Sequence, residues 1–346
     1  MKICWNLRFA VLTTLLLLAA CNSKEPLYQE QGYVFGTLVE VSVYGEDEVL
    51  SRQAVASVMR EFQRLHELLH AWKPSALSEL NSALAKGESK EVTPELVAML
   101  KDATQLSIQS DHLFNPAIGG MVQLWGFHAD EFKPALPNGK KLATLLATQP
   151  RMSDLVFNSN RVSSKNRAVQ IDLGGYAKGY ALDQAVALLK RQGVHNALIN
   201  IGGNVLALGT HGTRAWRIGI QHPRQPGPIA TMDLRDGEAV GTSGDYQHYF
   251  ILADKRYCHL IDPRSGQPVQ GVQAVTVLTR GERAGVLSDA VSKPLFVSGR
   301  AGWRAAARKM HLAEALLIDD EGTVHSTAAL QKRLEFSDKK ISQEIE

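Results

Sequence analysis

This chain has no large excess of positive or negative charge, few cysteines and neither of the standard nucleotide-binding loops. Its 38 basic and 35 acidic residues nearly balance over 346 positions, and no basic stripe stands out. This balance argues against a nucleic acid partner. Neither a P-loop nor a dinucleotide-binding glycine fingerprint is present, which removes the two commonest nucleotide sites. Only three cysteines occur.

The N-terminus has the pattern of an export signal. Residues 1–20 carry Lys2 and Arg8 ahead of a short apolar run, which is too short to span a membrane comfortably. The ending Leu18-Ala-Ala-Cys21 is similar to a bacterial lipobox and predicts acylation of Cys21, although an ordinary signal peptide with a chance cysteine is the alternative. We therefore expect a lipid anchor on the periplasmic face of a membrane, with residues 21–31 as a polar tether. Asn22 favours the outer membrane.

The remaining cysteine has no predicted partner. Cys4 leaves with the signal and Cys21 carries the lipid, so Cys258 cannot form a disulfide within the mature chain. The fold must then be held by its core alone, and roughly 325 mature residues are enough for one large or two moderate domains.

The segment Asp172 to Asp183 places a carboxylate, a glycine pair and a lysine where a predicted strand (168–171) becomes a helix. Gly174 and Gly175 let the backbone approach a ligand, and the first free N–H groups of a helix favour anions, phosphate above all. The alternative is a plain helix start in which the glycines serve only the turn. Asp172 and Lys178 favour a site, because a plain turn does not require them.

Periodicity elsewhere predicts an α+β fold. Helical spacing of apolar residues covers 47–69, and Thr93-Pro94 begins a further helix. Short, turn-bounded segments between 216 and 261 predict an antiparallel sheet region. Other expected elements are a first strand at 33–44, a buried strand broken at Gly202-Gly203, and helices at 285–299 and 303–310.

Several separated segments, in order along the chain, resemble the ApbE family of FAD:protein FMN transferases. Together with Lys73-Pro-Ser75 and Leu80-Asn81, they cover nearly the whole mature chain. The segments are Phe35-Gly-Thr37, Pro116 to Phe127, Asp172 to Asp183, Thr242-Ser-Gly-Asp245 with His259-x-Ile-Asp-Pro-x-x-Gly266, and Ser288-Asp-Ala-x-Ser292.

The resemblance implies an enzyme that takes FAD as substrate, splits its pyrophosphate and attaches FMN to a Ser or Thr hydroxyl, releasing AMP. The acceptor would be an exported or membrane redox protein with an FMN-binding domain. The implied fold is a mixed α/β body with a smaller β-rich portion and FAD in the cleft between them. We expect the transferase domain at 32–335 and a frayed tail at 336–346.

The resemblance also assigns residues. His259 is the general-base candidate, since an unperturbed histidine pKa lies near neutrality, and a structural histidine bonded to the 242–245 loop is the alternative. Asp245 either orients it or caps a turn. Core filling is the alternative for Trp72. The predicted flavin-binding residues are Phe35, Trp72, Ala117, Ile118, Gly119, Asp172, Lys178 and Ile261.

The implied metal site departs from the family pattern. Mg²⁺ would bind the carbonyl of Gly175 and the carboxylate of Asp289, and typical members supply a Thr four residues later. Here that residue is Lys293, and an ammonium offers no lone pair to a metal. Either Ser292 and waters complete the site, or Lys293 itself neutralises the pyrophosphate as a catalytic residue. Pro294 predicts a kink directly after it.

Two other functions compete with transfer. An FAD pyrophosphatase would release FMN and AMP to water from the same site. A flavin-binding lipoprotein without catalysis is the third, and Lys293 is the feature that favours it.

Overall fold

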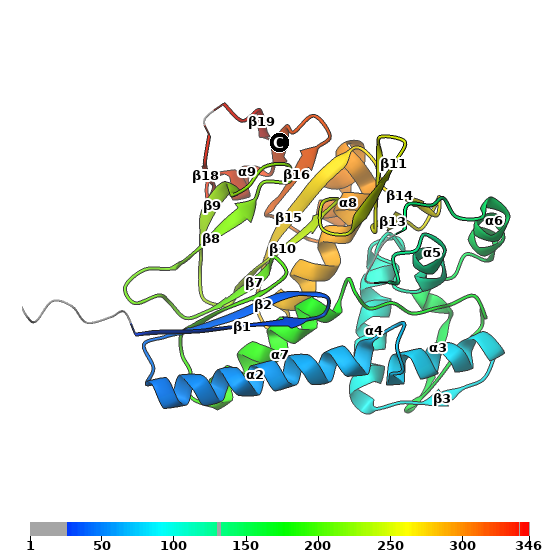
Figure 1. Ribbon diagram of the computed structural model, residues 1–346, viewed down its shortest axis with the longest axis horizontal. Helices are drawn as coiled ribbons and strands as arrows, with labels where there is room; N and C mark the ends of the chain where they lie inside the picture. Colours follow the sequence, from blue (N-terminus) through cyan, green and yellow to red (C-terminus); the bar gives the residue numbers. More distant parts are fainter. Residues whose placement is uncertain (1–25, 130–132, 339, 346) are drawn as a thin grey trace, which may run out of the picture.

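The computed structural model describes residues 26–129, 133–338 and 340–345, so the predicted signal peptide and Cys21 lie outside the described residues. A nine-stranded sheet forms the centre, in the order β1-β2-β6-β7-β10-β15-β16-β17-β19 (Figure 1). All neighbours are antiparallel except β17 and β19. The strands are β1 (Leu27–Val34), β2 (Thr37–Tyr44), β6 (Ala197–Ile201), β7 (Asn204–Leu208), β10 (Glu238–Gly244), β15 (Val272–Arg280), β16 (Ala315–Asp319), β17 (Val324–Ser326) and β19 (Gln343–Ile345).

The first two strands form a hairpin where the sequence predicted a tether followed by one strand. Phe35 and Gly36, with φ of 56° and 71°, make the turn, and Val34 pairs with Thr37. The tether boundary at residue 31 is therefore wrong. β1 is an edge strand with one mostly exposed face, so its polar sequence LYQEQGYV resembles a linker.

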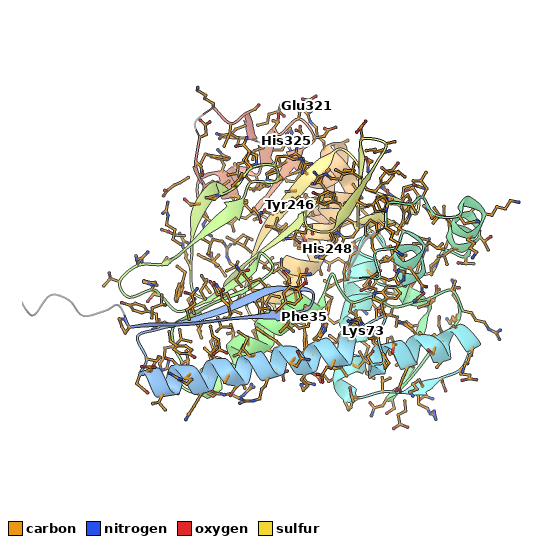
Figure 2. The ribbon with its side chains drawn as sticks, in the orientation of Figure 1. Phe35, Lys73, Tyr246, His248, Glu321 and His325 are labelled. Carbon is orange, nitrogen blue, oxygen red and sulfur yellow. The ribbon has the colours of Figure 1, made fainter. Side chains whose placement is uncertain are left out.

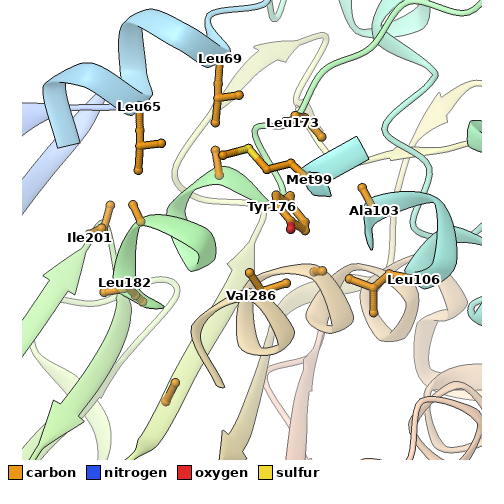
Figure 3. Close-up of a cluster of buried hydrophobic side chains, with 14 of the residues drawn as sticks. Leu65, Leu69, Met99, Ala103, Leu106, Leu173, Tyr176, Leu182, Ile201 and Val286 are labelled. Atoms are coloured by element: carbon orange, nitrogen blue, oxygen red, sulfur yellow. The ribbon is translucent and has the colours of Figure 1, made fainter. Parts of the chain in front are cut away.

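Helices cover one face of the sheet and a small sheet covers the other. The main core lies under α2 (Glu48–Leu69), α7 (Ala177–Arg191) and α8 (Ala284–Lys309). Figure 3 shows part of it, with Leu65 of α2, Leu182 of α7 and Val286 of α8 among the labelled side chains. A second core lies between the opposite face and the small sheet β18-β9-β8, made of β18 (Glu335–Phe336), β9 (Pro228–Leu234) and β8 (Trp216–Gln221).

A third apolar cluster joins a helical segment to a separate hairpin. It holds Ile118, Met121, Trp125, Phe250 and Ile261, from around α5 (Gly119–Leu124), β11 (Tyr249–Leu252) and β13 (Ile261–Asp262). The predicted antiparallel region is thus divided among three sheets, because β8 and β9 join the small sheet, β10 the central one and β11 only β12 (Lys255–Cys258).

The remaining elements fill the periphery. They are α3 (Ala76–Lys86), β3 (Lys90–Glu91), α4 (Pro94–Gln109), α6 (Gly139–Thr148), a short 3₁₀ turn η1 (Met152–Asp154), β4 (Leu155–Asn158), β5 (Arg161–Ser164), β14 (Gln267–Pro268) and α9 (Ala328–Gln331). Within the described ranges, no helix is both long enough and apolar enough to cross a membrane.

Three local predictions can be compared with these elements. The helices at 47–69 and from Pro94 are confirmed, with Asp47 and Thr93 as N-caps. The segment 196–209 is a hairpin rather than a broken strand, because Gly202 and Gly203 both take positive φ and reverse the chain. The tail is not wholly frayed, since β18 and β19 each pair with another strand.

The kink in the last long helix lies five residues beyond the predicted position. Pro294 stays within the helical part of α8, and Gly299, with φ of 64° and ψ of −176°, breaks it instead. A proline removes one N–H but keeps a helical φ, whereas Gly299 adopts a conformation open only to glycine.

Candidate functional site

The segment before Asp172 is held by side-chain and backbone bonds, and it is not the strand predicted at 168–171. Only Gln170 forms a bridge, with Ile118. Asn81 on α3 accepts a hydrogen bond from the Ile171 N–H (2.7 Å) and donates one to the Ile171 carbonyl (2.9 Å). The buried amide of Asn81 fixes the backbone at Ile171, and main-chain bonds to residues 116–119 hold the residues on either side of it.

The turn itself is short and tightly bonded. The Asp172 carboxylate accepts the N–H of Gly174 at 2.8 Å, and α7 begins at Ala177. Burial raises the pKa of Asp172, while the Gly174 N–H and the charge of Lys178 act in the opposite direction. The predicted helix start is confirmed, and the first turn of α7 forms a hydrogen bond with a distant part of the chain.

That other part is Asp289 on α8. Its Oδ2 accepts the Gly179 N–H at 3.0 Å, and the carboxylate is fully buried. The two helices approach closely at Gly179. A Cβ added to this residue would lie only 2.2 Å from the Gly285 carbonyl oxygen. No side chain fits there, so the glycine sets the distance that allows the bond.

A second carboxylate fixes the start of α8. Asp183 on α7 accepts the N–H groups of Gly285 (2.8 Å) and Val286 (2.9 Å). These are first-turn donors that an N-cap residue of the same helix would otherwise satisfy. Burial raises the pKa of Asp183 to about 6, against the effect of these two bonds.

Two ammonium groups surround the buried Asp289. Lys293 contacts Oδ1 and donates to the Asp289 main-chain oxygen at 2.7 Å. Lys178 Nζ lies 3.9 Å from the same Oδ1 and donates to the Gly174 carbonyl at 2.9 Å. Burial alone would raise the pKa of Asp289, but the two lysines outweigh it and hold the pKa at about 2. Burial lowers the pKa of Lys293, and the Asp289 carboxylate opposes that shift.

These contacts do not agree with Ser292 as a metal ligand. Its side chain is fully buried, donates to the Asp289 main-chain oxygen at 2.8 Å and shares a hydrogen bond with Ser243 of β10, also at 2.8 Å. It faces the sheet rather than the turn at Gly175, because α8 packs directly on β10 at Gly241, where a Cβ would lie 2.2 Å from the Ser288 carbonyl oxygen.

The residues at the predicted metal position therefore do not fit Mg²⁺. The side chain of Lys293 lies over Gly175, where an added Cβ would be 3.0 Å from Lys293 Cε. Its ammonium already occupies the Asp289 carboxylate. Among the described residues, no group of three or more His, Cys, Asp or Glu side chains could hold a metal.

His259 lies near this cluster and is neutral. The ring Nδ1 of His259 is 3.2 Å from the carbonyl oxygen of His248, and the main-chain N–H of His259 donates to that same carbonyl at 3.0 Å. With a proton on Nδ1, Nε2 is left as the acceptor. Burial, the neighbouring His248 and the charge of Lys178 lower the pKa of His259 to about 3, well below the near-neutral value predicted.

Asp245 does not orient that histidine. It forms a two-pronged ion pair with Arg224, with distances of 2.7 and 2.6 Å. This pair ties the 222–227 loop to the end of β10. The sequence offered no partner for Asp245, since Arg224 lies in an irregular segment.

The predicted wall at 117–119 is largely internal. Ala117 is fully buried in the main core, and a Cβ on Gly119 would lie 2.7 Å from the Gln170 carbonyl oxygen. Both residues serve the contact between two backbone segments, and the Ala117 methyl group lies in the core. Ile118 and Ile261 do come together, in the third apolar cluster.

The two predicted aromatic residues lie at different turns. Phe35 sits at the tip of the β1–β2 hairpin, 5.8 Å from the His66 ring, and Trp72 follows α2, 5.7 Å from the His128 ring. Both are half-buried and pack on the main core. Figure 2 labels Phe35 at the hairpin turn, Lys73 just after α2 and His248 in the loop before β11.

Sequence reasoning gave no role to three residues that build this site, although all three lie in segments that resemble the family. Asn81 could have been noticed as a polar residue in the apolar stripe of α3, and Asp183 as a carboxylate on a largely apolar helix. Gly179 carried no distinguishing signal.

Two cavities of about 240 and 270 Å³ lie elsewhere, beside Asp111 and Arg264, and no predicted site residue lines them.

Comparisons with known proteins extend over nearly the whole described chain. The model of a family described as the ApbE family matches residues 35–317. A protein of Rhodobacter capsulatus named FAD:protein FMN transferase is 44% identical over 310 residues, which are 90% of this chain and 59% of that protein. A Klebsiella pneumoniae (strain 342) protein of the same name is 30% identical over 320 residues, 91% of this chain and 96% of that protein. The crystal structure of the ApbE protein of Thermotoga maritima superposes with a TM-score of 0.81 at 28% identity, covering 89% of this chain and 99% of that one.

Proposed function

This chain belongs to the ApbE family, and on that basis we propose that it is an FAD:protein FMN transferase. It moves the FMN half of FAD onto a Ser or Thr hydroxyl of an acceptor protein and releases AMP. The acceptor is an exported or membrane redox protein with an FMN-binding domain.

The observation that carries this proposal is the cluster of Lys178, Asp289 and Lys293 at the first turn of α7. Within this cluster two ammonium groups outnumber one carboxylate, and the Asp172 carboxyl at the same turn has its pKa raised by burial. A pyrophosphate needs positive charge to offset its own, and the transfer of a phosphoryl group depends mainly on positioning and electrostatic stabilisation. The proposed reaction assigns no step to Mg²⁺.

His259 supplies the base in this proposal. The acceptor hydroxyl gives its proton to Nε2 of His259, and its oxygen forms a bond to the phosphorus of the FMN half. The bond between that phosphorus and the bridging oxygen breaks, and AMP leaves with the electron pair. The pKa of about 3 is that of His259 in the protein without substrate. In the complex, the two negative charges of the nearby pyrophosphate raise the pKa of the ring and make it a better base.

The flavin rings are held by apolar and aromatic groups in this proposal. Ile118 and Ile261 share one apolar cluster, while Phe35 and Trp72 present rings at turns beside the main core. Planar rings stack on such surfaces. Asp172 accepts hydrogen bonds from the flavin or the adenine in this proposal.

Mass spectrometry of an incubated acceptor tests the proposal. The purified protein is mixed with FAD and an FMN-binding domain carrying its Ser or Thr, and AMP is measured in parallel. A mass gain of FMN less one water per acceptor, with an equal amount of AMP, is the expected result. Free FMN and AMP without labelled acceptor would assign a pyrophosphatase instead, and unchanged FAD would assign a flavin-binding protein.

The cellular location is part of the proposal and rests on the N-terminal sequence alone. Cys21 carries a lipid that anchors the protein on the periplasmic face, with Asn22 favouring the outer membrane. Fractionation of cells that express wild type and Cys21→Ala tests this. Membrane association of the wild type and its loss in the variant are expected, and equal membrane association of both would contradict it.

A further inference from the structure

Lys293 occupies the point where a cation would lie. Its ammonium contacts Asp289 Oδ1 and the Asp289 main-chain oxygen. Its stem covers Gly175, with Cε and Cδ at 3.0 and 3.6 Å from where a Cβ would be. The side chain is only 15% exposed, so it fills the space between the turn and the carboxylate.

The side-chain oxygens of Asp289 and Ser292 are already engaged. Asp289 Oδ2 accepts the Gly179 N–H, and the hydroxyl of Ser292 is bonded to Ser243 and to the main chain. Mg²⁺ requires near-octahedral oxygen ligands. A divalent ion at this point would also lie beside two ammonium groups, at a separation where like charges repel strongly.

We propose that the ammonium of Lys293 takes the place of a divalent cation in this chain, so that neither FAD binding nor its cleavage requires Mg²⁺. An ammonium has three N–H donors. Two of those on Lys293 go to Asp289 in the described structure, which leaves the third for a phosphate oxygen. The statement about cleavage rests on the proposed function, whereas the statement about binding does not.

Charge balance explains why the arrangement is stable without a metal. Asp289 is fully buried, and a buried carboxylate needs a partner charge. Lys293 provides that charge from the same helix, four residues on, and Lys178 adds a second from α7. The charge of Asp289 is therefore balanced in the structure without a bound metal.

Cation binding and FAD affinity test the proposal without turnover. Protein freed of metal with EDTA is titrated with Mn²⁺, followed by electron paramagnetic resonance, and its FAD affinity is measured by flavin fluorescence with Mg²⁺ and with EDTA. For the wild type we expect no stoichiometric Mn²⁺ site and an FAD Kd that differs by less than about twofold between the two conditions, a difference of under 0.5 kcal/mol.

Lys293→Thr should reverse both results. It frees the Asp289 carboxylate, so we expect a stoichiometric Mn²⁺ site and an FAD Kd about tenfold weaker in EDTA than with Mg²⁺. Lys309→Thr is the matched control, because Lys309 lies on the same helix but pairs with Asp111. It should behave as the wild type does.

Each outcome decides the question. A wild type that binds Mn²⁺ stoichiometrically, or whose FAD affinity rises about tenfold with Mg²⁺, overturns the proposal. These wild-type titrations remain decisive if Lys293→Thr does not fold. Mg²⁺-independent binding without AMP release or acceptor labelling would overturn the proposed function and the cleavage claim, while the binding claim stands.

Discussion

Replacing Gly179 by alanine is expected to destabilise the protein at the crossing of α7 and α8. The added Cβ would lie 2.2 Å from the Gly285 carbonyl oxygen and 2.8 Å from Asp289 Cβ. Non-bonded atoms need about 3.5 Å, so the helices must separate by roughly 1 Å. Overpacking costs about 1–3 kcal/mol, and the weakened bond to the charged Asp289 about 1.5–3 kcal/mol. Better helix propensity returns about 1 kcal/mol, which leaves a net loss of about 1.5–5 kcal/mol.

Urea unfolding followed by circular dichroism measures this loss, as a lower midpoint at an unchanged slope. Gly139→Ala is the matched control, since Gly139 opens α6 and has no atom within 4 Å of an added Cβ. It should keep or raise the stability, by up to about 1 kcal/mol. If Gly179→Ala unfolds at the same urea concentration as the wild type, the close approach of the helices is not rigid and the reasoning fails.

Three further predictions concern single residues. The free energy of unfolding of the wild type should fall as the pH drops from 6.5 towards 3, because the unfolded chain binds a proton on His259 there while the folded chain, with its pKa of about 3, does not; His259→Gln should flatten this part of a urea-unfolding pH series, and equal slopes would contradict it. Asp183→Asn should cost about 1–2 kcal/mol in the same unfolding assay, since an amide accepts one of the two N–H bonds and opposes the other; unchanged stability would mean that water caps α8. Asn81→Ala should cost about 2–4 kcal/mol by leaving the N–H and carbonyl of Ile171 unsatisfied, and a loss below about 1 kcal/mol would show that this segment is held elsewhere.

Local patterns in the sequence were enough for much of the fold. The apolar spacing in 47–69 and the Thr93-Pro94 cap predicted α2 and α4, because both signals act within a few turns of one helix. Residues 27–31 were wrongly predicted to be a tether. Their strand is defined by its pairing with β2, and their own polar sequence does not indicate that pairing. Periodicity also could not distribute the strands between 216 and 261 among their three sheets.

The candidate site shows the same division. Asp172 and Lys178 were selected from the local pattern and Asp289 by resemblance, yet the contact between α7 and Asp289 depends on two helices meeting across 110 positions of sequence. The sequence showed that Lys293 offers no lone pair to a metal. It did not show which of the Ser292 and Lys293 side chains faces Gly175, because that depends on the packing of α8 against β10.

The sequence by itself thus determined the order of motifs, the helix caps and the identity of the charged groups, because those follow from composition and short-range geometry. Tertiary structure alone decided that Lys293 lies on the Asp289 carboxylate, that Ser292 faces the sheet, and that Asp245 pairs with Arg224 rather than with His259. The reason is physical: a buried charge is satisfied by whichever partner the packing brings within hydrogen-bond distance, and packing is a property of the whole chain.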